Sequence, residues 1–359
     1  MKKVYLILEN GKVFEGESIG AEGEVIGEVV FTTAMTGYLE TLTDPSYYGQ
    51  IVCQTFPLIG NYGVIEEDFE SRGSFVRGYI VRDICDTPSN FRSQGKLDDM
   101  LKKLGVVGIC GIDTRELTRI VRESGVLNGI ITSEPKLTKA KKDQLSQYVI
   151  KDAVASVSVD KKIVYSPKGE VKRKIALLDY GIKKNIIEKL LRRGCEVTVF
   201  PHDTSSEDII KFQPDGIMLS NGPGDPQENV YEIEQIKKLF SSGIPMFGIC
   251  IGHQMIALSQ GAKTYKLKYG HRGGNQPVKD VKTGRVYVST QNHGYAVDSK
   301  SLPKTAKISF TNVNDETCEG IDYENACVFS VQFHPEACAG PLDTGYLFDK
   351  FMENMEGTK

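Results

Sequence analysis

The stretch that decides the fold covers residues 244–259 and reads Ile244-Pro245-Met246-Phe247-Gly248-Ile249-Cys250-Ile251-Gly252-His253-Gln254-Met255-Ile256-Ala257-Leu258-Ser259. Its first six residues are a short apolar run and residues 254–259 favour a helix, so Cys250 is predicted to lie on a strand-to-helix turn. Gly248 and Gly252 flank the cysteine and permit a strained turn without a Cβ clash. A helix that begins directly behind the thiol favours the thiolate and supplies backbone N–H groups for an oxyanion hole. The pattern is typical of a nucleophile elbow.

A second motif, His334-Pro335-Glu336, supplies a candidate base and orienting acid for this thiol. Residues 328–333 partly alternate between apolar and polar, which predicts a strand that ends at His334. Pro335 disfavours helical backbone at the residue before it, so we expect His334 to be extended. Glu336 would then hold one ring nitrogen while the other faces Cys250, as in a Cys-His-acid triad.

The other seven cysteines are interpreted as small buried hydrophobic residues. Cys110 is the useful comparison, because its surroundings resemble those of Cys250 but lack a Gly two positions later and a following His-Gln pair. The sequence has no Cys-x2-Cys and no His-x3-His pair, so no metal site is expected. Eight cysteines without a signal peptide favour a reducing compartment.

Composition sets the remaining bounds on function. The chain has 359 residues, 40% of them hydrophobic, which is enough for two domains with sizeable cores. A net charge of −3 gives no general attraction to nucleic acid, so nucleic acid is not an expected partner. The apolar run at the start is too short for a secretory signal, and no run reaches membrane-spanning length. We therefore expect a soluble, cytoplasmic protein without a membrane partner.

A polar, charged segment divides the sequence into two parts. Residues 156–173 are predicted to be a linker between an N-terminal domain, 1–155, and a C-terminal domain, 174–359. Strands are predicted at 175–181, 195–200, 216–220 and 244–249, with helical stretches between them. This alternation predicts an α/β fold with a doubly wound, mostly parallel sheet whose ligands bind at the carboxyl ends of the strands. The N-terminal domain is predicted to be strand-rich α/β and to open with a hairpin around Asn10-Gly11.

Two polar turns are candidates for substrate binding. Ser220-Asn221-Gly222-Pro223-Gly224-Asp225-Pro226 follows a predicted strand, and its backbone groups could line a pocket beside Cys250; a plain tight turn is the alternative. Gln291-Asn292-His293-Gly294-Tyr295 follows a strand predicted at 285–289 and offers donors and acceptors suited to an amino acid. His293 and His253 have no acidic residue nearby in sequence and are interpreted as structural.

The motifs at 248–254, 220–226 and 334–336 together resemble those of the class I (triad) glutamine amidotransferases, which hydrolyse glutamine and pass the ammonia to a synthetase. The resemblance extends beyond that domain, to the small, glutamine-hydrolysing subunit of carbamoyl-phosphate synthetases. It implies a flavodoxin-like glutaminase fold for 174–359 and an interface with a large subunit for 1–155. The further motifs that carry it are 27–31, 35–38, 43–47, 57–63, 111–115, 270–275 and 340–343.

The resemblance implies roles for individual residues. Cys250 would be the nucleophile, His334 the base and later the acid, and Glu336 the residue that orients it. Attack on L-glutamine would release ammonia and leave a γ-glutamyl thioester, which water then hydrolyses. The backbone N–H groups of Gly224 and Ile251 would form the oxyanion hole. The implied glutamine contacts are Ser46, Gly222, Gly224, Ile251, Gln254, Asn292, Gly294 and Tyr295, with Gln254 and Ser46 at the amino-acid end.

Nucleotide-binding motifs are absent from the sequence. It has no Gly-x4-Gly-Lys-Ser/Thr loop and no Gly-x-Gly-x2-Gly fingerprint after a strand, so no cofactor is expected in this chain. The resemblance implies a separate large subunit that uses Mg-ATP and bicarbonate, and makes carbamoyl phosphate for arginine or pyrimidine biosynthesis, or both. Two other hypotheses stay open: a free-standing Cys hydrolase such as a γ-glutamyl peptidase, and a catalytically silent regulatory or scaffolding subunit. The intact set of Cys250, His334 and Glu336 disfavours the silent subunit.

Overall fold

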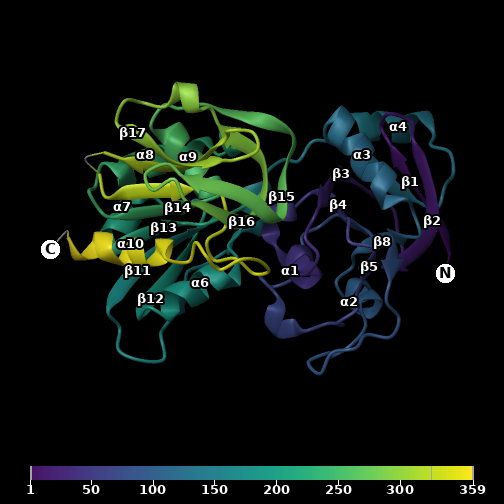
Figure 1. The fold of residues 1–359 in the computed structure, drawn as a ribbon, viewed down its shortest axis with the longest axis horizontal. Coiled ribbons are helices and arrows are strands. Elements are labelled where there is room, and N and C mark those ends of the chain that lie inside the picture. Colours follow the sequence, from purple (N-terminus) through teal and green to yellow (C-terminus); the bar gives the residue numbers. More distant parts are fainter. Residues whose placement is uncertain (1, 325, 358–359) are drawn as a thin grey trace. The chain divides into compact units, whose positions relative to one another are not determined.

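The chain folds into two units, Met1–Lys151 and Asp152–Lys359, in a computed structural model that describes residues 2–324 and 326–357 (Figure 1). The segment predicted as a linker, 156–173, contains regular structure: the end of α5 (Ala153–Val157), a short strand, and Arg173, the first residue of β11 (Arg173–Asp179). Its residues Ile163–Tyr165 form strand β10, which pairs antiparallel with a strand of the second unit. The sequence Ile-Val-Tyr has high β propensity, and charged flanks had obscured it.

The first unit is a closed barrel, which agrees with the strand-rich domain predicted from the sequence. Its strands follow the order β1-β2-β8-β6-β4-β3-β9, and β9 pairs with β1 to close it. The strands β3, β4, β6 and β8 run parallel to their neighbours in this series. The barrel strands are β1 (Lys3–Leu8), β2 (Val13–Gly20), β3 (Val25–Thr32), β4 (Gln50–Gln54), β6 (Gly78–Ile80), β8 (Val107–Cys110) and β9 (Leu127–Thr132).

Helices and short strands complete the first unit. Strands β1 and β2 form the predicted hairpin, with Gly11 at a φ of 88° in the turn. The further elements are β5 (Leu58–Ile59), β7 (Asp83–Ile84), α1 (Tyr38–Thr43), α2 (Leu97–Lys103), α3 (Thr114–Ser124) and α4 (Lys139–Ser146), with 3-10 turns at Pro45–Tyr47 and Glu66–Asp68.

The second unit is built on a ten-stranded sheet in the order β10-β12-β11-β13-β14-β19-β18-β16-β15-β17. Within it, β12-β11-β13-β14-β19 are parallel and give the order 2-1-3-4-5 of flavodoxin-like folds, so the predicted fold class is confirmed. The strands are β11 (Arg173–Asp179), β12 (Cys195–Pro201), β13 (Gly216–Leu219), β14 (Met246–Ile249), β15 (Thr264–Asp280), β16 (Val286–Val297), β17 (Ala306–Asn312), β18 (Cys318–Tyr323) and β19 (Val328–Val331).

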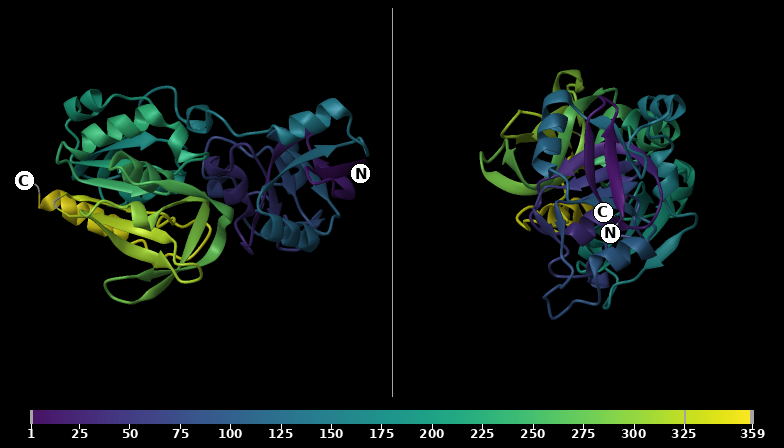
Figure 2. Two further views of the ribbon diagram at one scale, coloured as in Figure 1. Left: turned by 90° about the horizontal axis from the view of Figure 1, so that it is seen from above. Right: turned by 90° about the vertical axis from the view of Figure 1, so that its right-hand side faces the viewer.

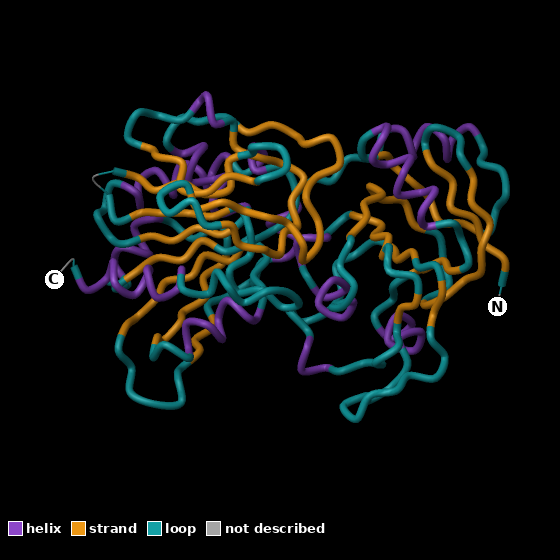
Figure 3. The backbone as a smooth tube through the Cα atoms, in the orientation of Figure 1, coloured by secondary structure: helices purple, strands orange, loops and turns teal. Residues whose placement is uncertain are grey.

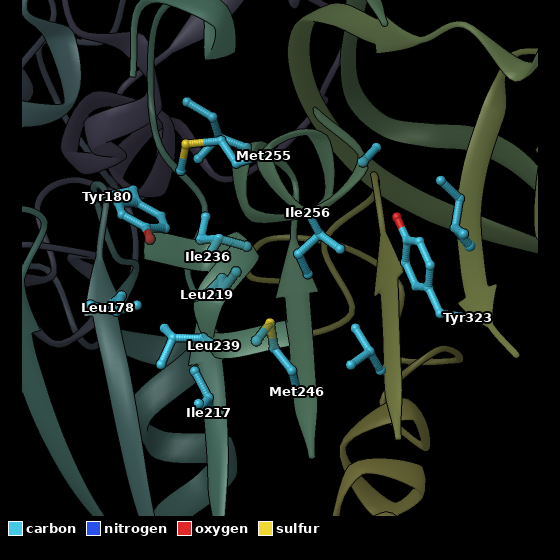
Figure 4. Close-up of a cluster of buried hydrophobic side chains, with 14 of the residues drawn as sticks. Leu178, Tyr180, Ile217, Leu219, Ile236, Leu239, Met246, Met255, Ile256 and Tyr323 are labelled. Atoms are coloured by element: carbon cyan, nitrogen blue, oxygen red, sulfur yellow. The ribbon is translucent and has the colours of Figure 1, made fainter. Parts of the chain in front are cut away.

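Helices cover both faces of this sheet, as Figures 1 and 3 show. Side chains of α7, α8 and α9 pack on one face, and those of α6 and α10 on the other. Figure 4 shows the first cluster, in which Ile236 and Leu239 of α8 and Ile256 of α9 lie against Leu219 and Met246 of the strands. The helices are α5 (Ala153–Val157), α6 (Lys184–Leu191), α7 (Ser206–Lys211), α8 (Val230–Phe240), α9 (Ile251–Ser259) and α10 (Leu347–Glu356), with 3-10 turns at Pro226–Glu228 and Ser299–Ser301.

The topology leaves one edge of the parallel sheet where a functional site can form. The carboxyl ends of β11, β13, β14 and β19 lie along the same edge, because these strands are parallel neighbours. Figure 2 gives two further views of this sheet and its helices. Within the described residues, no helix has the length and apolar character needed to cross a membrane.

Candidate active site

Cys250 lies between the end of β14 and the start of α9, on the predicted strand-to-helix turn. Its backbone has a φ of 55° and a ψ of −106°, a strained conformation for a non-glycine residue that costs about 1–3 kcal/mol and is typical of functional sites. The flanking glycines are required by packing. A Cβ on Gly252 would lie 2.5 Å from the Leu219 carbonyl oxygen, and one on Gly248 would lie 2.9 Å from the backbone of Gly252.

The position of the thiol is fixed by neighbouring strands. The Cys250 N–H donates to the Val331 carbonyl of β19 at 2.9 Å. Its Sγ lies 3.7 Å from the carbonyl oxygen of Asn292 on β16, and the residue is 2% exposed. The nucleophile is therefore held in a buried position between the elbow and two strands.

His334 and Glu336 follow β19, the parallel neighbour of β14, so they emerge at the same edge of the sheet as Cys250. Imidazole Nδ1 of His334 lies 2.6 Å from Glu336 Oε1, and both side chains are fully buried. The carboxylate accepts from Nδ1–H, which leaves Nε2 as the basic nitrogen. Nε2 is buried and makes no hydrogen bond with any described residue, as expected for a nitrogen reserved for a proton transfer.

Lys183 is a functional residue that the sequence analysis missed. Its Nζ lies 2.7 Å from Glu336 Oε1 and donates to the Ala337 carbonyl at 3.3 Å, although only 3% of its side chain is exposed. Burial opposes ionisation of Glu336, but the charge of Lys183 and the hydrogen bonds that Lys183 and His334 donate outweigh it and lower the pKa of the carboxyl to about 2. Glu336 is therefore a carboxylate throughout the physiological range, and it keeps His334 in one orientation.

Only the position of Lys183 in the strand order indicates its role in the site. The residue follows the first parallel strand, β11, at the edge where ligands bind, but the pair Lys183-Lys184 looks like a solvated helix start in sequence. Asn221 holds this segment: its Oδ1 accepts from the Lys183 N–H at 3.1 Å, and its Nδ2 donates to the Gly181 carbonyl at 2.9 Å. The loop after β13 thus positions the cation that supports the triad acid.

Alternate residues of the strand that leads to His334 contact α9. Ser330 Oγ lies 2.8 Å from His253 Nδ1, and Gln332 Oε1 accepts from Gln254 Nε2 at 2.8 Å. Burial lowers the pKa of His253 to about 3, so this ring is neutral and structural, in line with the prediction. The sequence does not mark Gln332, because a buried glutamine just after a strand has no distinctive pattern.

The orientation of the Gln254 side-chain amide is fixed, and it determines which hydrogen-bonding group faces a ligand. Its Nε2 donates to the Tyr295 carbonyl at 2.8 Å as well as to Gln332, so both amide hydrogens are used. The Tyr295 carbonyl can only accept, which fixes the amide against a flip. Oε1 makes no hydrogen bond with any described residue, so Gln254 presents an acceptor.

Several residues predicted to bind glutamine come together around the thiol. The Gly252 N–H donates to the Ser220 carbonyl at 3.2 Å, which ties the elbow to the turn that contains Gly222. A Cβ on Gly222 would overlap the Tyr180 carbonyl oxygen and approach Ile251 to 3.2 Å. Asn292, Gly294 and Tyr295 lie on β16, which contacts both Cys250 and Gln254.

Two predicted contacts are placed less directly. Gly224 lies in the same turn as Gly222, with a φ of 87°, where a Cβ would lie 2.8 Å from Ala153 Cβ. Ser46 belongs to the first unit, in the 3-10 turn Pro45–Tyr47, where its N–H donates to Asp44 Oδ1 at 2.9 Å. Its contact with glutamine stays a prediction.

A buried ionisable cluster adjoins the strand that carries Asn292. His271 lies 2.8 Å from Asp315 and 3.5 Å from Glu319, and ligand atoms of His271, His293 and Glu319 lie within 4.8 Å of one another. Both ring nitrogens of His293 already contact protein oxygens, at 2.7 Å and 3.0 Å, so a metal ion would have to displace one. Burial lowers the pKa of His271, but the hydrogen bonds that its ring donates to Asp315 and Glu319 outweigh it and raise the pKa to about 9. The cluster therefore stabilises this part of the sheet through ion pairs.

The class of protein follows from the fold and the site together. A thiol on a strand-to-helix elbow, with a buried His-Glu pair after the next parallel strand, is the arrangement of a Cys-His-acid hydrolase domain. The family model for glutamine amidotransferase class-I matches residues 176–354. Among solved structures, a putative GMP synthase subunit from Thermoplasma acidophilum covers 53% of this chain and 96% of its own, with 22% identity and a TM-score of 0.46.

The N-terminal half shows which family of glutamine amidotransferases the chain is similar to. The family model for the carbamoyl-phosphate synthase small chain, CPSase domain, matches residues 6–131. The carbamoyl phosphate synthase small chain of Clostridium perfringens is 50% identical over 351 residues, which cover 98% of this chain and 99% of the relative. Those of Fusobacterium nucleatum and Listeria monocytogenes serotype 4b are each 49% identical, over 98% and 99% of this chain and 98% of each relative. The chain belongs to the carbamoyl phosphate synthase small chain family, which confirms the resemblance found in the sequence.

Proposed function

We propose that this chain hydrolyses L-glutamine to glutamate and ammonia, and that it supplies the ammonia to the large synthetase subunit of a carbamoyl phosphate synthase. The observation that carries the proposal is the charged array behind the nucleophile. Glu336 is buried between His334 and Lys183, at 2.6 Å and 2.7 Å, and the free nitrogen of the imidazole lies at the same sheet edge as Cys250. In nucleophilic catalysis, the buried acid orients the imidazole, and the free imidazole nitrogen takes the proton of the nucleophile.

The first half of the reaction transfers an acyl group to sulfur. His334 Nε2 takes the proton of the Cys250 thiol, and the thiolate attacks the γ-carbonyl carbon of glutamine. The C–N bond then breaks as the imidazolium returns the proton to the leaving nitrogen, which departs as ammonia. Glu336 stays ionised and stabilises the imidazolium while it exists, because its pKa lies near 2.

The second half regenerates the thiol. Water attacks the γ-glutamyl thioester while His334 Nε2 accepts one of its protons, the C–S bond breaks, and the proton passes to the sulfur as glutamate leaves. The negative oxygen that forms in each half would be stabilised by the backbone N–H groups of Ile251, the first residue of α9, and Gly224. The N-terminus of α9 favours the same charge.

Recognition of glutamine would depend on groups that match its amino-acid end. Oε1 of Gln254 is an acceptor and suits the α-ammonium group, while backbone groups of Asn292, Gly294 and Tyr295 on β16 and of Gly222 line the site. Because Gln254 is held by Gln332 and by the Tyr295 carbonyl, the acceptor is positioned before the substrate arrives. This proposed reaction uses no cofactor in the present chain.

The remaining chemistry would belong to the partner. The large subunit would use Mg-ATP and bicarbonate and combine the activated product with ammonia to make carbamoyl phosphate, for arginine or pyrimidine biosynthesis, or both. Full-length relatives with the name of the small chain support this division of labour.

The test is glutamate release from glutamine by the purified chain, alone and with the large subunit, Mg-ATP and bicarbonate. We expect slow release by the chain alone, strong stimulation by the complete mixture, and formation of carbamoyl phosphate. Fast hydrolysis that the partner leaves unchanged would instead favour a free-standing hydrolase. If no condition gave hydrolysis, the proposal would be wrong and the scaffolding hypothesis would stand.

A further inference from the structure

A basic pocket in the first unit has no role in the proposed hydrolysis. Its volume is about 830 Å³, and four arginines line it: Arg82, Arg115, Arg119 and Arg122. All of its lining residues belong to the barrel unit, whereas the triad belongs to the second unit. The pocket therefore needs an explanation of its own.

The barrel topology gathers the pocket at one end. Thr33, Thr55, Arg82 and Asp113 follow β3, β4, β6 and β8 respectively, and each of them lines the pocket. These four strands are parallel neighbours, so their carboxyl ends lie together at one edge, and α3 follows β8 directly (Figure 1). The carboxyl ends of parallel strands are the usual place for binding sites in α/β folds.

The charge of the pocket is opposite to that of the whole chain. Four guanidinium groups face two carboxylates, Asp83 and Asp113, which leaves an excess of two positive charges in a protein of net charge −3. One of these carboxylates is engaged, since Asp113 Oδ1 accepts from the Glu116 N–H at 2.9 Å as the N-cap of α3. The lining groups themselves therefore leave positive charge uncompensated.

The arginines are available for a partner. Among the residues that the structure describes, Arg82, Arg115 and Arg122 have no ion pair, and Arg119 has only Glu123, at 4.0 Å. Arg115, Arg119 and Arg122 follow the helical spacing of four and three, so they share one face of α3, where like charges destabilise a helix slightly. A guanidinium fork is well matched to carboxylates, which it can bind through two parallel hydrogen bonds.

Two exposed apolar residues lie next to lining residues of the pocket in the sequence. Met35, two residues after Thr33, is 73% exposed, and Leu58, which follows the lining residue Pro57, is 42% exposed. Met and Arg are both enriched at protein–protein interfaces, and this composition favours a protein partner over a small anion.

We propose that this pocket docks an acidic segment of the large synthetase subunit, whose Asp or Glu carboxylates pair with Arg82, Arg115 and Arg122. The inference rests on the proposed function for the existence of that partner. It goes beyond the family assignment, because it locates the interface on the carboxyl ends of the parallel barrel strands and on one face of α3. The docking pocket has no part in glutamine hydrolysis itself.

The experiment compares two charge reversals in the full-length chain. Arg115→Glu changes the pocket, and a Glu in the first turn of α3 is compatible with the helix. Lys142→Glu, on the exposed part of α4, makes the same change in net charge elsewhere in the unit. We measure the Kd for the large subunit by biolayer interferometry, at low and high salt, together with the basal glutaminase activity of each chain.

The expected result is a Kd that rises about 10–100-fold for Arg115→Glu and less than about twofold for Lys142→Glu, with basal hydrolysis unchanged in both. Added salt should weaken the wild-type complex more than the Arg115→Glu complex. Arg82→Glu, in a different loop, should act in the same direction and guards against a local effect on α3.

Three results would overturn the proposal, and they are distinguishable. If the large subunit binds Arg115→Glu and Arg82→Glu as tightly as it binds the wild type, the pocket is not the dock, and the proposed function survives. If inorganic phosphate stabilises the wild type but not Arg115→Glu against heat, while Kd is the same for both, the pocket is a small-anion site. If the wild type shows no binding to the large subunit, the proposed function fails together with the docking site.

Discussion

Replacing Lys183 by Met should damage both the stability and the catalytic pH profile of this protein. Lys183 and Glu336 form an ion pair of 2.7 Å in which the side chains are 3% and 0% exposed. Met has a similar length but no charge, so the variant leaves Glu336 buried with His334 as its remaining partner in the array. The perturbation thus removes one interaction without a large change in volume.

The size of the effect follows from the pKa of Glu336. Lowering that pKa from 4.5 to about 2 corresponds to about 3 kcal/mol in favour of the carboxylate, since one unit is worth about 1.4 kcal/mol. Lys183 supplies the largest favourable part, and burial, the largest cause overall, acts in the opposite direction. Without Lys183 the pKa of Glu336 should rise. A loss of about 3–5 kcal/mol is typical when one partner of a buried ion pair is removed.

Urea unfolding and the pH dependence of kcat/KM check this prediction. Because the folded pKa of Glu336 is depressed, its stabilisation is present above 4.5 and lost as the pH falls through 2 in the wild type. In Lys183→Met the acid limb of the glutaminase profile should move to higher pH. Lys237→Met, on the exposed face of α8, is the matched control and should stay within about 0.5 kcal/mol of wild type. If Lys183→Met behaved like that control in both assays, the reasoning would be refuted.

Three further predictions test other parts of the site. Gln332→Leu should raise KM for glutamine about tenfold with a smaller change in kcat, because it removes the hydrogen bond that orients Gln254. Steady-state kinetics measure KM and kcat separately, and an unchanged KM would contradict the prediction. The pKa of His271 is raised to about 9, so its stabilisation is complete only below pH 6.5, and the free energy of unfolding should fall by up to about 3 kcal/mol as the pH rises from 6.5 through 9. In urea titrations His271→Asn should remove most of that slope and leave the part due to His202, whose pKa is raised by its hydrogen bond to Glu232; an unchanged slope would contradict this. Gly252→Ala should cost about 1–3 kcal/mol, because the new Cβ would meet a backbone carbonyl of β13; wild-type stability of this variant would show that the elbow tolerates it.

Much of the C-terminal fold was predictable because its signals are local. Each parallel strand is a short apolar run bounded by turn residues, and the order of strands and helices along the chain specifies a doubly wound sheet. The elbow could be located from Gly248 and Gly252, whose roles depend on backbone contacts within one turn.

The features that escaped prediction depend on contacts between distant residues. Closure of the barrel requires β9 to pair with β1 over more than a hundred positions, and no local pattern specifies it. Lys183 becomes part of the site only when β11 and β19 bring it to Glu336. Gln332 likewise acquires its role from α9, across the sheet. Neither residue type nor spacing marks such partners in one sequence.

The central claim is that Cys250 is the nucleophile that carries the γ-glutamyl group. Its most direct test is mass spectrometry of the peptides of the chain after reaction with glutamine and an acid quench. We predict the mass of a γ-glutamyl group on the peptide that contains Cys250, and its absence from Cys250→Ser, which should also lose glutamine hydrolysis but still support ammonia-dependent synthesis in the complex. An adduct on another cysteine, or undiminished hydrolysis by Cys250→Ser, would contradict the account.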